Sequence, residues 1–200
     1  LGFLQEDLFL LQQICQKTSG MILVVGPTGS GKTTTLYSML NEVDYVSKNI
    51  VTIEDPVEYH LTGISQVSVN PEQSLSFVQA LRAFLRQDPD IILVGEIRDE
   101  ETAQVAVRAA LTGHLVLTTL HSLSVTTTLQ RLHNLGIETN LLADTLQLIL
   151  SQRLVRKRCS CNFSSSCPQC NGSGFYGRIP VYEILYVSTT IRERIQQNYF

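Results

Sequence analysis

The sequence predicts an α/β fold in which helices flank a largely parallel sheet. Helical and strand-like patterns alternate from residue 5 to about residue 150, and this alternation is typical of sheets built from βαβ units. A glycine-rich loop of the phosphate-binding type lies between a predicted strand and a predicted helix, its usual place in such sheets. Four cysteines crowd into twelve residues near the C-terminus, so we expect a small cysteine-rich insertion.

The first third of the chain predicts a helix followed by an alternation of strands and helices. Leu8, Leu11 and Cys15 share one helical face, and Ser19-Gly20 ends that helix. The next apolar run is short and is followed directly by the glycine-rich loop. Up to residue 69 we expect strands at 21–25, 50–53 and 64–69 and a helix at 31–43.

The remaining elements are delimited by proline, serine and aspartate. Pro71 and Ser74 introduce a helix that continues to about residue 86, and the segment 88–90 (Asp-Pro-Asp) breaks it. Residues 125–135 and 141–154 both have a helical pattern, and we expect two helices with no strand between them. The other expected elements are strands at 91–94, 114–119 and 179–186 and helices at 100–111 and 190–197.

These elements suggest a division into three parts. Residues 1–155 are expected to form the core, and residues 179–200 to add a closing strand and helix. The segment 156–178 between them is rich in Cys, Gly and Ser and nearly free of aliphatic residues, so we interpret it as an irregular insertion that carries four cysteines.

Composition excludes several classes of protein. A hydrophobic content of 44% fits one globular domain, and a net charge of −3 provides no general attraction for nucleic acid. The apolar runs at 21–25 and 91–94 are far shorter than the roughly 20 residues that span a bilayer. Residue 1 is Leu and no signal-peptide pattern follows it, so we expect a soluble domain that begins inside a longer protein.

The glycine-rich loop matches the Walker A pattern Gly-x-x-x-x-Gly-Lys-Thr completely. Its backbone N–H groups and the following helix N-terminus are suited to phosphate oxygens. We expect Lys32 to reach the β- and γ-phosphates of ATP and the Thr33 hydroxyl to bind Mg²⁺. The expected nucleotide-binding residues are Gly26, Pro27, Thr28, Gly29, Ser30, Gly31, Lys32, Thr33 and Thr34.

Acidic residues follow two of the predicted strands. Glu54, Asp55 and Glu58 follow the strand at 50–53, and Glu96 follows the strand at 91–94. Catalytic groups of open α/β sheets gather at such strand ends, and hydrolysis requires carboxylates that orient water and hold the metal's waters. The alternative is that each acid is only a solvated residue at a strand end.

Histidines and arginines supply candidate sensors and charge stabilisers. His114 and His121 bracket one strand and are about 23 Å apart along an extended chain, so they cannot contact the same phosphate. We favour His121 as the γ-phosphate sensor because it lies at the carboxyl end of the strand. Arg82, Arg86 and Arg98 flank the strand at 91–94 and could neutralise transition-state charge, although Arg82 and Arg86 also fit an ordinary solvated helix face.

The cysteine cluster consists of Cys159, Cys161, Cys167 and Cys170. In a nucleotide-binding protein of a reducing cytoplasm, such crowding indicates a metal site before it indicates disulfides. Four thiolates around Zn²⁺ would close its coordination shell, so we expect a structural zinc rather than a catalytic one. Free thiols are the alternative. The basic run 153–158 beside the cluster is either a solvated face or a contact for anionic lipid or an acidic partner.

Four motifs in this order resemble those of the type II secretion and type IV pilus assembly ATPases. They are the Walker A loop 26–33, the acidic segment 52–58 that resembles the family's Asp box, the segment 88–99 that resembles its Walker B motif, and the segment 112–122 that resembles its His box. The resemblance implies a RecA-like P-loop NTPase domain, with Lys32, Glu58, Glu96 and His121 as catalytic candidates. By the same resemblance, Glu54, Asp55 and Glu58 belong to the Asp box, and His114 and His121 belong to the His box.

The resemblance also implies a biological role. Members of this family form homohexameric rings at the cytoplasmic face of the inner membrane and hydrolyse ATP to assemble a pseudopilus or pilus through a platform protein. Assembly members tend to carry a tetracysteine insertion, which argues against a retraction motor or a conjugation-type ATPase. The single residue between Cys159 and Cys161 departs from the family's Cys-x-x-Cys spacing. The family also has an N-terminal domain that supplies arginines to the nucleotide, and we expect that part of the site to lie outside residues 1–200.

Two other classes remain as alternatives. A nucleic-acid translocase would need a basic groove that carries aromatic residues, and this acidic chain without Trp shows none; we therefore expect no nucleic-acid partner. A structural subunit that binds ATP without hydrolysing it is the second alternative. The choice among secretion, pilus and competence systems is not encoded in these motifs.

Overall fold

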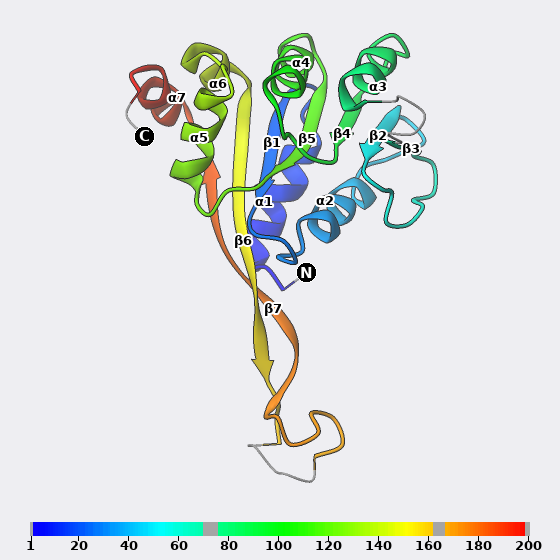
Figure 1. Cartoon of the computed structure of the whole chain (residues 1–200), viewed down its shortest axis with the longest axis vertical. Helices are drawn as coiled ribbons and strands as arrows, with labels where there is room; N and C mark the ends of the chain where they lie inside the picture. Colours follow the sequence, from blue (N-terminus) through cyan, green and yellow to red (C-terminus); the bar gives the residue numbers. More distant parts are fainter. Residues whose placement is uncertain (1, 70–75, 162–166, 199–200) are drawn as a thin grey trace.

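A seven-stranded sheet organises the chain in the computed structural model, which describes residues 2–69, 76–161 and 167–198. The strand order is β3-β2-β4-β5-β1-β6-β7, and all neighbours are parallel except the antiparallel pair β6 and β7 (Figure 1). The strands are β1 (Gly20–Val25), β2 (Ile50–Glu54), β3 (Ser65–Ser68), β4 (Ile91–Val94), β5 (Leu115–Leu120), β6 (Leu146–Arg158) and β7 (Phe175–Tyr186).

Helices cover both faces of the sheet. They are α1 (Gln5–Cys15), α2 (Lys32–Asn41), α3 (Phe77–Phe84), α4 (Glu100–Leu111), α5 (Val125–Asn134), α6 (Thr139–Thr145) and α7 (Thr189–Gln196). Alternate residues of β1 enter two separate apolar clusters, because successive side chains of a strand point to opposite faces. One cluster packs on α1 and α2, and the other packs on the remaining helices. This architecture confirms the predicted α/β fold.

The expected helix at 141–154 is wrong. Helix α6 ends at Thr145, and the chain continues as the 13-residue strand β6. The apolar run at 146–150 fits a buried helix and a buried strand equally well by periodicity alone. Hydrogen bonding to β1 on one side and to β7 on the other decides for the strand.

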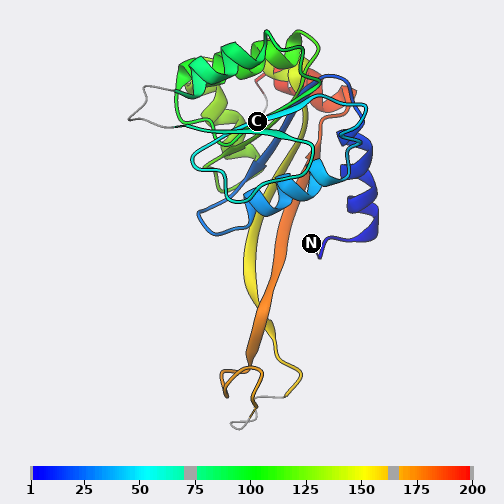
Figure 2. The ribbon, with the colours of Figure 1, turned by 90° about the vertical axis from the view of Figure 1, so that its right-hand side faces the viewer.

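Strands β6 and β7 continue beyond the sheet as a two-stranded hairpin. The residues of β6 up to Gln152 are buried, whereas Arg153 and residues 155–158 are exposed, and both views show the hairpin projecting away from the other elements (Figures 1 and 2). Pairing extends to Arg158 opposite Phe175, so ordered strands enter the segment expected to be irregular at both of its ends. Between residues 153 and 182 the sequence contains five basic residues and no acidic one, namely Arg153, Arg156, Lys157, Arg158 and Arg178.

Other elements lie close to their predicted positions. The predicted start of the third helix, at Pro71 and Ser74, falls outside the described residues, and its described part begins at Phe77 with Ser76 as the N-cap. In the described part of the chain, no helix is long and apolar enough to cross a bilayer.

Candidate active site

The phosphate loop joins the end of β1 to the start of α2. Gly26 and Gly31 have φ values of 149° and 88°, which glycine adopts without the steric cost of a Cβ atom. A Cβ on Gly26 would lie 2.3 Å from the carbonyl oxygen of Gln152 and 2.7 Å from Ser30 Oγ. The turn therefore fits closely against β6 and requires glycine at this position.

Lys32 is the first residue of α2 and reaches back across the loop. Its Nζ donates to the carbonyl oxygens of Gly26 (3.0 Å) and Pro27 (3.2 Å). Burial lowers the pKa of Lys32, and the nearby carboxylate of Glu96 opposes this effect. A partly desolvated ammonium group at a helix N-terminus is suited to a phosphate anion.

The loop fits the triphosphate that its sequence predicts. Among the described residues, Ser30 Oγ is a buried polar atom without a hydrogen-bond partner, and such atoms are rare in proteins. Lys32, Thr33 and Thr34 line the adjoining cleft. The backbone N–H groups, the ammonium group and the hydroxyl groups at this loop form a donor set for phosphate oxygens and a Mg²⁺ ion.

Glu54 and Tyr37 form a buried network at the end of β2. Glu54 accepts hydrogen bonds from Thr52 Oγ1 (2.5 Å), from Tyr37 Oη and from Gln66 Nε2 (3.3 Å). Burial and the hydrogen bond to Glu54 raise the pKa of Tyr37. These donors fix the first acid of the Asp box, whereas Asp55 and Glu58 lie in the exposed loop that follows.

Glu96 connects three of the sequence motifs. Its carboxylate accepts a hydrogen bond from Arg98, and Arg98 also donates to Asp55 Oδ2 at 3.3 Å. The Nε2 atom of His121 lies 3.5 Å from the other oxygen of Glu96. The hydrogen bond from Arg98 lowers the pKa of Glu96, desolvation opposes this, and the charges of Arg98, His121 and Lys32 lower it further. Glu96 is therefore ionised at neutral pH.

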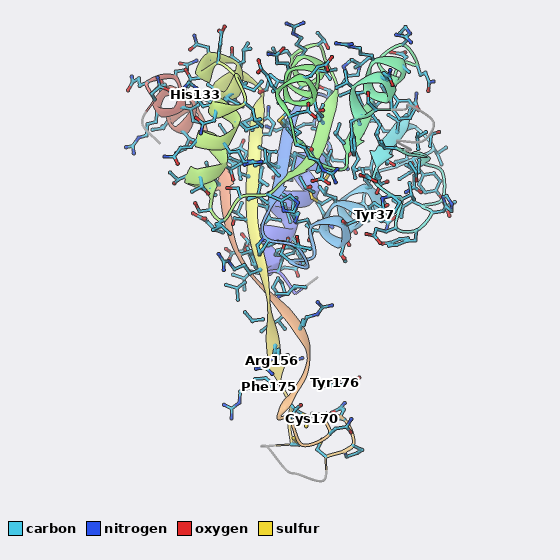
Figure 3. The ribbon with its side chains drawn as sticks, viewed as in Figure 1. Tyr37, His133, Arg156, Cys170, Phe175 and Tyr176 are labelled. Atoms are coloured by element: carbon cyan, nitrogen blue, oxygen red, sulfur yellow. The ribbon has the colours of Figure 1, made fainter. Side chains whose placement is uncertain are left out.

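The two histidines lie at opposite ends of β5, as their spacing requires. His121 faces the cleft beside Glu96. His114 lies at the other end, where its Nδ1 is 3.0 Å from the carbonyl oxygen of Ala109 at the end of α4. His60 and His133 are exposed, and His133 lies near the end of α5 (Figure 3).

The three candidate arginines have different surroundings. Arg98 contacts Glu96 and Asp55. Arg82 is instead paired with Glu101 of α4 at 3.1 Å, on the surface. Arg86 is exposed just beyond α3. Neither Arg82 nor Arg86 lines the cleft formed by the described residues.

One cleft of about 530 Å³ brings the four motifs together. The cleft lies between the phosphate loop and the ends of β2, β4 and β5. These ends form the carboxyl edge of the parallel sheet, where ligands of such folds bind. Its lining residues are Thr28, Gly29, Ser30, Gly31, Lys32, Thr33, Thr34, Glu54, Asp55, Pro56, Glu58, Tyr59, Phe77, Gly95, Glu96, Thr119 and His121.

Sequence reasoning missed Gln152 and Thr119. Gln152 bonds to the phosphate loop, and Thr119 Oγ1 donates to the carbonyl oxygen of Gly95 at 2.7 Å, which ties the end of β5 to the residue before Glu96. The role of Gln152 was not recognised because residues 141–154 were expected to form a helix, which does not place this side chain against the phosphate loop. The available signal was a polar residue, Gln152, that alternates with Leu150 and Leu154 on one face of a strand.

Cys170 lies at the end of the hairpin away from the sheet (Figure 3), and the other three cysteines, Cys159, Cys161 and Cys167, gather beside it. Their Sγ atoms all lie within 4.8 Å of one another, with Cys159 and Cys167 at 3.9 Å and Cys161 and Cys170 at 3.5 Å. Tetrahedral Zn–S bonds of about 2.3 Å place sulfurs about 3.8 Å apart. Desolvation raises the pKa of Cys170, but hydrogen bonds from the other thiols and from the Gly174 backbone outweigh it and lower the value to about 7. The cluster could therefore hold a metal ion, despite the single residue between Cys159 and Cys161.

Comparison with known proteins identifies the family. The family described as type II/IV secretion system protein matches residues 1–199. The chain belongs to this family. Among family members, the type II secretion system protein HxcR of Pseudomonas aeruginosa is 48% identical over 205 residues, covering 98% of this chain and 44% of that protein. The type IV pilus assembly ATPase PilB of Myxococcus xanthus is 45% identical over 213 residues, covering 92% and 38%.

A solved structure has the same fold as this chain. The pilus retraction motor PilT with bound ADP superposes with a TM-score of 0.82 at 39% identity and covers 99% of this chain and 55% of that chain. This similarity confirms the predicted P-loop fold of the family. The chain spans less than half of the length of the curated relatives named above.

Proposed function

We propose that the chain is the motor domain of an ATPase that powers assembly of a type II secretion pseudopilus or a type IV pilus. The observation that carries the proposal is the single cleft in which the phosphate loop, Glu96 and His121 meet. Identity of 45–48% to a secretion protein and a pilus assembly ATPase supports the same role. In this role the domain works as a ring of six copies at the cytoplasmic face of the inner membrane, in contact with a platform protein.

Several side chains in and beside the cleft have distinct tasks in this proposal. Lys32 binds the β- and γ-phosphates of ATP, and the Thr33 hydroxyl holds Mg²⁺, which neutralises phosphate charge. Glu96 or Glu58 orients the attacking water, because a carboxylate near the γ-phosphate can accept its proton. His121 senses the γ-phosphate and passes its presence to Glu96 through their contact. Arg98 lowers the pKa of Glu96 further through its hydrogen bond.

The retraction motor is the second candidate, since PilT matches the fold closely. The cysteine cluster favours assembly, because assembly members of the family tend to carry a tetracysteine insertion and retraction motors do not. Deleting the gene for the full-length protein separates the two roles. Loss of the surface fibre or of secretion supports an assembly motor, whereas an excess of fibres on the cells contradicts it and indicates retraction.

His121 and His114 provide a matched test of the sensor assignment. We expect His121→Ala to lower kcat for ATP by roughly 10²-fold, since it removes the imidazole that faces the cleft. His114→Ala should leave kcat nearly unchanged, because the His114 imidazole bonds to Ala109 and Thr112 at the end of α4, at the opposite edge of the sheet. Steady-state phosphate release by the full-length protein measures both. Equal losses in the two variants would contradict the assignment.

The metal proposal makes its own prediction. Purified full-length protein should contain about one zinc per chain by elemental analysis, held by four thiolates. Cys159→Ser and Cys170→Ser should each lose most of this zinc, whereas Cys15→Ala, which alters a lone buried thiol on α1, should retain it. A zinc content near zero in the unaltered protein would reject the site.

A further inference from the structure

Gln152 lies where β6 passes beneath the phosphate loop. Its side chain is 2% exposed, and both ends of its amide are bonded. Nε2 donates to the carbonyl oxygen of Ser30 at 2.7 Å, and Oε1 accepts from Thr35 Oγ1 at 2.9 Å. One amide therefore bridges the loop and the first turns of α2.

The backbone of the same residue also limits the loop. A Cβ on Gly26 would meet the Gln152 carbonyl oxygen at 2.3 Å, and a Cβ on Gly31 would meet Gln152 Nε2 at 3.2 Å. Both glycines of the Walker A pattern thus lie directly against Gln152. The loop shape and the position of this residue on β6 are mutually dependent.

The chemistry of the position differs from that of its neighbours. Leu148, Leu150 and Leu154 are the neighbouring side chains that alternate with Gln152 along this face of β6. A buried amide carries a desolvation cost that only its hydrogen bonds offset. A simple packing role would be served equally well by another Leu, so the amide points to a task that needs its hydrogen bonds.

The bond to Ser30 sets the direction of one peptide unit. In a planar trans peptide the carbonyl of one residue and the N–H of the next point in opposite directions. Because Nε2 draws the Ser30 carbonyl oxygen toward β6, the N–H of Gly31 points away from β6. Gly31 lines the cleft. The same bond also keeps a carbonyl dipole from facing a phosphate anion.

We propose that Gln152 is a positioning residue for the nucleotide, which holds the phosphate loop in the shape that receives the phosphates. This inference rests on the proposed ATP binding. A loop that is already oriented loses no free energy to reorganisation when the anion binds. Without the amide the loop must be ordered at the moment of binding, and affinity falls.

Gln152→Met in the full-length protein tests the proposal, since Met fills a similar volume without hydrogen bonds. We expect the Kd for Mg-ATP and for ADP, and the KM for ATP, to rise about tenfold, which is the loss of roughly one well-formed buried hydrogen bond. We expect kcat to fall much less. Gln152→Asn, which retains the amide on a shorter side chain, is expected to shift the same constants less and serves if the Met variant does not fold.

Gln147→Met is the matched control on the same strand. Gln147 is also buried and accepts hydrogen bonds from Lys17 (2.5 Å) and Arg192 (3.3 Å), but it lies beside Gly20 at the start of β1, whereas the loop follows the end of β1. It should lower the melting temperature without changing KM. An equal rise of KM in both Met variants, or an unchanged nucleotide Kd in Gln152→Met, would overturn the proposal.

Thr35→Val distinguishes the two bonds of the amide. It removes the partner on α2 and leaves the Ser30 bond, so it should weaken nucleotide binding less than Gln152→Met does. An equal effect would show that anchoring of α2, and not the direction of the Ser30 carbonyl, is what matters. If the unaltered protein binds no nucleotide, the proposed function fails; normal binding by both the unaltered protein and Gln152→Met rejects only the role of Gln152.

Discussion

Lys32→Met is expected to reduce ATP hydrolysis by the full-length protein by roughly 10³-fold. The Lys32 ammonium is the cation at the N-terminus of α2, and it already bridges the loop through Gly26 and Pro27. Its removal takes away both the charge that meets the β- and γ-phosphates and a tie that holds the loop closed. Mg-ATP binding should weaken together with turnover, because the charge acts in the ground state and in the transition state.

Lys48→Met is the control for this prediction. Lys48 forms a surface ion pair with Asp90 at 3.4 Å, before β2 and away from the cleft. Surface pairs contribute about 0–1 kcal/mol to stability, so this variant should keep its turnover. Phosphate release and nucleotide titration, measured for both variants, compare their turnover and their nucleotide binding. A Lys32→Met enzyme that retains more than about a tenth of the activity would refute the assigned role of Lys32.

Glu96→Gln is expected to lower kcat by roughly 10²- to 10³-fold while nucleotide binding persists. The amide cannot accept a proton from water, but it occupies the same volume beside Arg98 and His121. Because Arg98 holds the pKa of Glu96 below its usual range, the unaltered carboxylate stays charged over the neutral pH range. The neutral variant also lacks the negative charge that faces the phosphates, so ATP should bind at least as tightly as before.

Two further glutamates make this experiment decisive. Glu101→Gln alters an exposed partner of Arg82 and should leave turnover unchanged. Glu58→Gln alters the other catalytic candidate, in the loop after β2. If Glu96→Gln retains full turnover and Glu58→Gln loses it, the water-orienting carboxylate belongs to the Asp box. Single-turnover phosphate release, together with the melting temperatures, separates these outcomes from misfolding.

Much of the cleft could be predicted because local rules determine it. The Walker A pattern defines its own loop, and the rule that parallel strands end at one edge places Glu96 and His121 together. The separation of His114 from His121 follows from the length of the strand between them. The family-level fold follows from the order of the motifs.

The remaining features of the fold and the cleft depend on tertiary contacts that cannot be predicted from local sequence patterns. The run at 146–150 becomes a strand only because β1 and β7 pair with it, and Gln152 reaches the loop only through that strand. Arg82 lies in α3 before β4, and Arg98 lies in the loop after β4. Only the fold reveals that Arg98 contacts Glu96 and that Arg82 contacts Glu101. The spacing of Cys159 and Cys161 gave no measure of how closely the thiols gather.

Strand β6 belongs to the sheet at one end and to the hairpin at the other, and it has no interruption at Gln152. From that residue to Arg158 it spans about 20 Å at 3.3–3.4 Å per residue. Because β6 is continuous from the sheet into the hairpin, a rigid rotation of the sheet would move the far end of the strand in proportion to this length. A rotation of about 10° would carry the cysteine tip through about 3–4 Å, roughly the rise of one residue along a strand.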